Sequence, residues 1–159
     1  SGIQEAPKPQ TPPVAQQQVE VFWLKGSGVR QQLVATTATT TADIKKQPTA
    51  ALKTAFDNLL SGPKDGSVST TIPQGTTLRD LKVEKDGIHV NLSEDFTAGG
   101  GSTAMTGRVA QVIYTATSLD PSAKVWIEVE GEPLEVLGGE GLELEQPLTR
   151  QSLGENFTL

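Results

Sequence analysis

Alternation of apolar and polar residues predicts a hairpin near the start of the chain. The stretch VEVFWL at residues 19–24 carries apolar side chains on both of its faces, which favours a strand that is covered on at least part of each face. Gly26 and Gly28 allow a tight connection to the threonine-rich run RQQLVATTATTT at residues 30–41. Two β-prone runs joined by glycines indicate a hairpin.

A second hairpin is predicted from the stretch VEKDGIHVNL at residues 83–92. Asp86-Gly87 fits a two-residue turn, and the residues that follow it alternate between apolar and polar types. A further strand is expected in KVWIEVEG at residues 124–131. Its alternation divides the side chains into an apolar face of Val125, Ile127 and Val129 and an opposite face of Trp126, Glu128 and Glu130.

Two stretches show helical spacing instead. The first covers residues 48–61, where Pro48 can occupy the first turn and Gly62-Pro63 is expected to end the helix; its apolar stripe consists of Leu52, Phe56, Leu59 and Leu60. The second begins with Ser102 or Thr103 as the N-cap and ends at Asp120-Pro121; its stripe consists of Met105, Val109, Val112, Ile113, Ala116 and Leu119. The second helix is expected to cover the sheet.

The resulting order, β-β-α-β-β-α-β, predicts an α+β domain with two helices packed on a mostly antiparallel sheet. The last residues, from 132 onward, place Gly and Pro too close together for another long element, so short strands or an extended wrap are expected there. Residues 1–18 are rich in Pro and Gln and are expected to form a disordered tether, which leaves residues 19–159 as a single folded domain.

Charge and composition exclude several classes of function. The chain has 159 residues, a formal net charge of -6 and no cysteine. Nucleic-acid binding rests on clustered Lys and Arg, which are missing here, so no nucleic-acid partner is expected. Without cysteine there is no disulfide, thiolate nucleophile or Cys-ligated metal. The longest apolar runs are far short of a membrane span, so any contact with a membrane is expected to run through an N-terminal anchor outside this sequence.

The residues that could carry chemistry are scattered. His89 is a lone histidine without a nucleophile beside it and is interpreted as a surface side chain, and the adjacent Glu94 and Asp95 are a weak pair for hydrolysis. The acidic series from Glu128 to Glu145 has no calcium-loop spacing, so neither a metal nor a cofactor is expected. A glycine-rich loop before the second helix could hold an anion or ligand through its backbone N–H groups; it comprises Gly99, Gly100, Gly101, Ser102 and Thr103.

The connection between the first helix and the second hairpin, NLLSGPKDGSVSTTIPQGTTL at residues 58–78, is unusually long and polar. Its Gly and Pro residues end a helix and direct the chain into the next strand, which favours an architectural role. A recognition role for its threonine-rich surface stays open.

Four motifs in this order resemble the GerM domain family, named after a sporulation and germination protein and also found in envelope lipoproteins and cyanobacterial proteins. They are the helix end LLSGP, the loop IPQGT, the hairpin ending NLSEDF and the helix AQVIYT, and the similarity runs from about residue 19 to residue 157. The resemblance implies a fold similar to ring-building motifs and a membrane-tethered module outside the cytoplasm, in the periplasm or cell envelope. It supplies no catalytic residues.

Two functions are therefore compared. The first is a non-enzymatic module that binds other envelope proteins through a sheet edge or an exposed face, with Trp126, Glu128 and Glu130 as the candidate interaction surface. The alternative is a ligand-binding or sensory module for a cell-wall fragment, in which the glycine-rich loop, the threonine-rich strand and Trp126 supply the contacts. Oligomerisation is left open.

Overall fold

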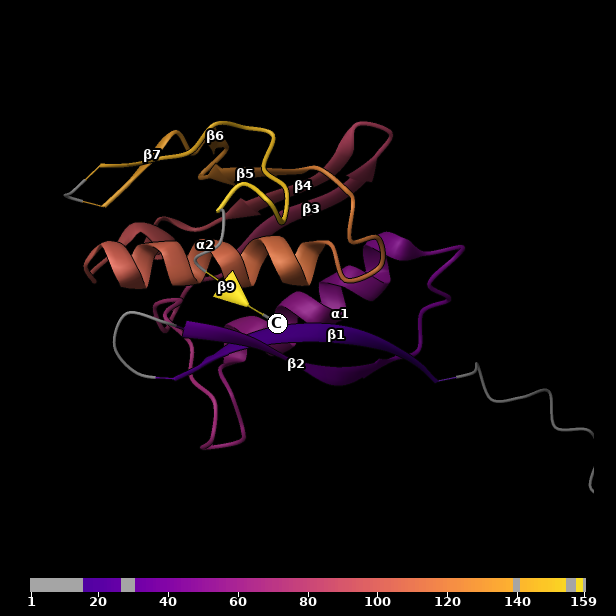
Figure 1. Cartoon of the computed structure of the whole chain (residues 1–159). Helices are drawn as coiled ribbons and strands as arrows, with labels where there is room; N and C mark the ends of the chain where they lie inside the picture. The colour runs from indigo at the N-terminus through magenta and orange to yellow at the C-terminus, as the bar shows by residue number, and fades with distance from the viewer. Residues whose placement is uncertain (1–15, 27–30, 139–140, 154–156, 159) are drawn as a thin grey trace, which may run out of the picture.

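The computed structural model describes residues 16–26, 31–138, 141–153 and 157–158, and it confirms an α+β fold (Figure 1). The main elements follow the predicted order: β1 (Gln17–Lys25), β2 (Gln31–Thr40), α1 (Pro48–Ser61), β3 (Leu78–Glu84), β4 (Gly87–Leu92), α2 (Ser102–Ala116) and β5 (Val125–Val129). A 3-10 helix, η1 (Glu94–Thr97), precedes α2, and short strands follow β5: β6 (Glu132–Pro133), β7 (Val136–Leu137), β8 (Leu142–Glu143) and β9 (Phe157–Thr158).

The described strands form separate sheets. One has the order β1-β2-β9, a second has the order β3-β4-β5-β6, and β7 pairs with β8 alone. Most neighbouring strands are antiparallel, whereas β4 pairs with β5 and β2 pairs with β9 in parallel. The chain reaches β5 from β4 through α2, which supplies the long crossover that a parallel pair requires.

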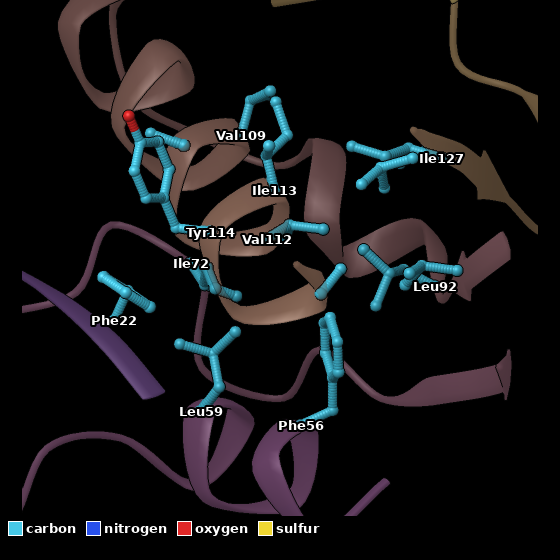
Figure 2. Close-up of a cluster of buried hydrophobic side chains, with 14 of the residues drawn as sticks. Phe22, Phe56, Leu59, Ile72, Leu92, Val109, Val112, Ile113, Tyr114 and Ile127 are labelled. Carbon is cyan, nitrogen blue, oxygen red and sulfur yellow. The ribbon is translucent and has the colours of Figure 1, made fainter. Parts of the chain in front are cut away.

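Helix α2 lies between the β1-β2-β9 sheet and the sheet of β3, β4, β5 and β6, which we call the β3-β6 sheet (Figure 1). Every residue from Gly107 to Ala116 is buried, polar ones included, so α2 is enclosed on nearly all sides. Figure 2 shows the resulting core, in which Val112 and Ile113 of α2 lie among side chains from α1 and both sheets. Helix α1 contributes Phe56 and Leu59 to this core, as its predicted stripe requires.

The long connection after α1 is part of the core architecture. The backbones of Leu24 and Ser69 exchange two hydrogen bonds of 2.8 Å, which attach the connection to β1. The Thr71 hydroxyl donates to the carbonyl of Ala104 at 2.8 Å, and Ile72 is buried. These contacts support the architectural interpretation of residues 58–78.

Several predicted boundaries are wrong for local reasons. Strand β1 begins at Gln17, so Gln17 and Gln18, which pair with Thr40 and Thr39, belong to the fold rather than to a tether. The rest of the predicted tether, apart from Gln16, lies outside the described residues. The N-cap position of α2 is Gly101, without a side-chain cap, instead of Ser102 or Thr103. The hairpin turn consists of Lys85 and Asp86, because Gly87 already pairs with Glu84.

Candidate interaction surface

The β3-β6 sheet has one face turned away from the helices, and we call it the outer face. Alternation along β3, β4 and β5 directs Leu81, Val90 and Ile127 into the core, so their neighbours point outward. The outer face consists of Asp80, Lys82, Glu84, His89, Asn91, Trp126 and Glu128. A shallow hollow of about 310 Å³ is lined by all of these except Trp126.

Trp126 and His89 form the aromatic part of the outer face. They are partners in the parallel register of β4 and β5, and their rings stack at a centroid distance of 5.7 Å with an interplanar angle of 12°. His89 Nε2 lies 2.7 Å from Asp86 Oδ1 of the hairpin turn. The prediction of an exposed histidine is therefore only partly right, because 27% of its side chain is accessible and the ring has two partners.

The predicted group of Trp126, Glu128 and Glu130 is divided by the end of β5. Trp126 and Glu128 are half-buried on the strand, where Glu128 pairs with Asn91 in the register. Glu130 lies beyond the strand and has a φ of 48°, a value uncommon for a residue other than glycine. The alternation of a strand therefore does not extend to Glu130, and the prediction that places it on the same strand face is wrong.

Glu130 instead fixes the position of the turn after β5. Its carboxylate accepts hydrogen bonds from Arg79 Nε at 3.0 Å and from the backbone N–H of Glu94 at 3.2 Å. The Arg79 side-chain hydrogen bond, followed by the Glu94 N–H, lowers the pKa of Glu130 below its usual value. Glu130 thus joins β3, η1 and the β5 turn at one edge of the outer face.

The start of the glycine-rich loop and the segment before it bind an arginine of the chain itself. Arg108, which is 3% exposed, donates from its guanidinium to the carbonyls of Phe96 at 2.9 Å, Ala98 at 2.8 Å and Gly99 at 3.0 Å. Burial lowers the pKa of Arg108. The loop therefore turns the carbonyl of Gly99 toward an internal cation, and anion binding by the residues Gly99, Gly100, Gly101, Ser102 and Thr103 stays a prediction.

The three contact regions of the predicted cell-wall site do not meet. The glycine-rich loop precedes the first turn of α2, Trp126 is on β5, and the threonine-rich strand β2 belongs to the other sheet. Trp126 instead borders a pocket of about 490 Å³ near the C-terminal end of α2, whereas the loop is at the opposite end of that helix. A helix of 15 residues separates its ends by roughly 22 Å, which is too far for one small ligand.

This pocket has an apolar wall and a charged rim. Its apolar lining comes from α1, from the β3-β4 hairpin and from the segment after α2, and includes Leu52, Val83, Ile88 and Leu119. The charged residues that also line it are Glu84, Lys85, Asp86, Asp120 and Lys124. The indole N–H of Trp126 is buried and has no hydrogen-bond partner among the described residues. Alternation along β5 indicated that Trp126 was important but could not indicate this pocket, which depends on three distant segments.

Two further residues that the sequence analysis did not single out hold the fold at long range. Arg150 lies over the Tyr114 ring, 4.5 Å from its centroid, and donates to the hydroxyl of Thr117 at 2.7 Å. Burial is the main cause that lowers the pKa of Arg150. Gln146 bonds both the N–H and the carbonyl of Ile127 at 2.7 Å, so its amide takes the place of a neighbouring strand along β5.

Comparison with known proteins identifies the family. The Germane family, described as sporulation and spore germination, matches residues 20–135. The chain belongs to the Germane family. This membership confirms the GerM resemblance drawn from the four sequence motifs, and the match covers both helices and strands β2 to β6.

Solved structures show the same fold as this Germane chain. The first GerMN domain of the sporulation protein GerM from Bacillus subtilis is 19% identical with a TM-score of 0.59, and the match covers 85% of this chain and 98% of that one. The tandem GerMN domains of the same protein are 19% identical with a TM-score of 0.61, and the match covers 86% of this chain and 47% of that one. A candidate lipoprotein from Clostridium perfringens is 18% identical with a TM-score of 0.57, and the match covers 86% of this chain and 89% of that one. The comparison with curated proteins gives no match.

The described residues provide neither a membrane span nor a metal-binding group. None of the helices in the described ranges combines the length and the apolar character needed to cross a bilayer. Within the same ranges, no three acidic or histidine side chains gather closely enough to hold a metal ion.

Proposed function

We propose that this Germane chain is a non-enzymatic protein-interaction module outside the cytoplasm, membrane-tethered in its full-length protein, which helps to assemble or regulate an envelope complex. Membership in a sporulation and germination family supports this role, as does the fold shared with a sporulation protein and a candidate lipoprotein. The observation that carries the proposal is the outer face, which neither helix covers and which joins a stacked aromatic pair to charged side chains.

The chemistry of the outer face supports a basic protein as the partner. Three carboxylates, from Asp80, Glu84 and Glu128, border the hollow, and Lys82 is the one ammonium group among its lining residues. Lys82 itself is paired with Asp80 at 3.7 Å. The face is therefore acidic and fits a basic patch on another envelope protein, while the partly exposed ring of Trp126 provides a flat aromatic contact.

Charge reversal at Glu128 tests this proposal. The tagged full-length protein would be purified from its native membrane as wild type, as Glu128→Lys and as the control Glu145→Lys, which changes an exposed glutamate outside the outer face. We expect Glu128→Lys to reduce the yield of co-purified envelope proteins by about tenfold, whereas Glu145→Lys leaves it unchanged.

Circular dichroism and melting curves would show that both variants keep the wild-type fold. Equal capture by wild type and a folded Glu128→Lys variant would exclude the outer face as the binding surface. Turnover of a cell-wall substrate by the purified wild-type chain would overturn the non-enzymatic assignment itself.

The pocket beside Trp126 supports a second function, which is recognition of a cell-wall fragment. Its volume of about 490 Å³ lies within the usual range for small-molecule sites. Trp126 is one of its lining residues. We expect Trp126→Phe, which makes the side chain of a lining residue smaller, to weaken binding of a muropeptide in calorimetry; equal binding by both proteins would argue against this pocket.

A further inference from the structure

The backbone of β2 leaves one edge of the first sheet open. Phe22 and Leu24 of β1 direct their N–H and C=O groups away from β2, because Phe22 bonds Thr115 and Gln111 side chains while Leu24 bonds Ser69. Their partners in the antiparallel register are Ala35 and Leu33. In such a pair the N–H and C=O groups of both residues point away from the partner strand. The N–H and C=O groups of Ala35 therefore point toward the edge of β2 that is far from β1.

Alternation along β2 gives Thr37 and Thr39 the same outward backbone direction as Ala35. Strand β9 pairs with this edge only at Gln31 and Gln32. Beyond Gln32, no described segment pairs with it; Leu33 shares this backbone direction but is buried, whereas Ala35, Thr37 and Thr39 are exposed. The open edge is thus about three hydrogen-bonding positions long.

Other long strand edges in the described ranges are at least partly protected. The far edge of β1 is occupied at Phe22 and Leu24 by Gln111, Thr115 and Ser69. Strand β3 has a bulge between Leu78 and Asp80 and carries charged side chains along most of its length, two features that prevent unwanted strand addition. Strand β6 has only two residues. In contrast, the β2 sequence LVATTATT at residues 33–40 has no charge and no proline.

We infer that the open edge of β2 pairs with β2 of a second copy of this chain, in antiparallel orientation about a two-fold axis at Thr37. Thr37 would then face its own copy, and Ala35 would face Thr39 of the partner. Each of these pairs exchanges two backbone hydrogen bonds, which gives about six across the interface. The pairing leaves β9 in place, because Gln31 and Gln32 would lie opposite residues after the end of the partner's β2.

The uncharged composition of the edge favours a second copy as the occupant. The chain carries a net charge of -6, so two copies repel each other in general, but residues 33–40 of β2 themselves add no charged side chain to this edge. Threonine pairs across neighbouring strands are favourable, and the self-pairing places Thr37 against itself. This inference concerns the sheet opposite the outer face and does not rest on the proposed function.

Sedimentation equilibrium of the full 159-residue chain would test the inference. From about 5 µM to about 500 µM, we expect the average mass to rise from 16.8 kDa toward twice that value. Thr37→Pro removes an outward N–H without touching the hydrogen bonds to β1, and Thr37→Lys places two ammonium groups opposite each other at the axis. Both should raise the dissociation constant at least tenfold.

Gln18→Lys is the matched control, because Gln18 is an exposed residue of β1, pairs with Thr39 and lies on the same sheet face away from the axis. It adds the same charge as Thr37→Lys and should leave the dissociation constant unchanged. A wild-type chain that stays monomeric throughout the range would overturn the inference. So would a dimer that persists in Thr37→Lys, even if Thr37→Pro failed to fold.

Discussion

Replacing Gln111 with Met tests whether the buried amide on α2 holds three segments together. Gln111 is completely buried, and its Nε2 donates to the carbonyl of Phe22 at 3.1 Å. Its Oε1 accepts from the backbone N–H of Thr71 at 3.0 Å, and the hydroxyl of Thr70 lies within hydrogen-bond distance of both amide atoms. Methionine has a similar length and volume but offers neither a strong donor nor a strong acceptor.

The magnitude follows from the groups that lose their partners. In the Met variant, the buried Phe22 carbonyl is left unpaired, which costs about 1 to 3 kcal/mol, and the part-buried Thr71 N–H costs less, about 1 to 2 kcal/mol. The partly exposed Thr70 hydroxyl can turn to water, so it adds little. Because the volume is conserved, the cavity contribution is small. We therefore expect Gln111→Met to lower the free energy of unfolding by about 2 to 5 kcal/mol.

Urea unfolding followed by circular dichroism would measure this change. Gln32→Met is the control, since Gln32 is exposed on β2, and it should change stability by no more than about 0.5 kcal/mol. A double-mutant cycle with Thr70→Val would isolate the Gln111–Thr70 interaction, for which we expect about 1 kcal/mol. A loss below about 1 kcal/mol for Gln111→Met would refute the argument that this amide satisfies otherwise unpaired backbone groups.

Two other predictions concern the loop before α2 and the turn after β5. Gly99 and Gly100 both have positive φ, but a Cβ at Gly100 would lie 2.8 Å from the Ala104 Cβ and 2.9 Å from Arg108 Nη2, whereas one at Gly99 meets nothing. Gly100→Ala should therefore cost about 1 to 2 kcal/mol more than Gly99→Ala in urea unfolding, and equal costs would contradict this packing. Arg79 and the Glu94 N–H lower the pKa of Glu130 in the folded state. The ionised carboxylate therefore stabilises the fold fully at pH values above its unfolded-state pKa. This contribution is lost as the pH falls through the lower folded-state pKa. The urea midpoint of wild type should thus fall more steeply than that of Glu130→Gln from about pH 6 to about pH 3, and parallel profiles would show that the carboxylate contributes nothing.

Local interactions made much of the fold readable from the sequence. The bounds of α1 were predicted correctly because proline is compatible only with the first turn and because Gly62 adopts a φ of 90° at the helix end. The hairpins were predicted correctly because alternation with a period of two fixes the faces of each strand. The same alternation placed Trp126 and Glu128 on the outer face, opposite Val125 and Ile127.

The sequence by itself therefore determined the elements, their order and the faces of the strands, since these depend on residues close together in the chain. Only the tertiary structure decided that α2 is enclosed, because Arg108 and Gln111 are buried through hydrogen bonds to backbone groups that no local pattern identifies. Phe22 and Gln111, for example, are 89 positions apart. Likewise, the turn that removes Glu130 from the outer face depends on Arg79 of β3, and the open edge of β2 depends on which strands pair elsewhere. Each of these features is set by the packing of distant segments, where the cost of leaving buried polar groups unpaired selects one arrangement.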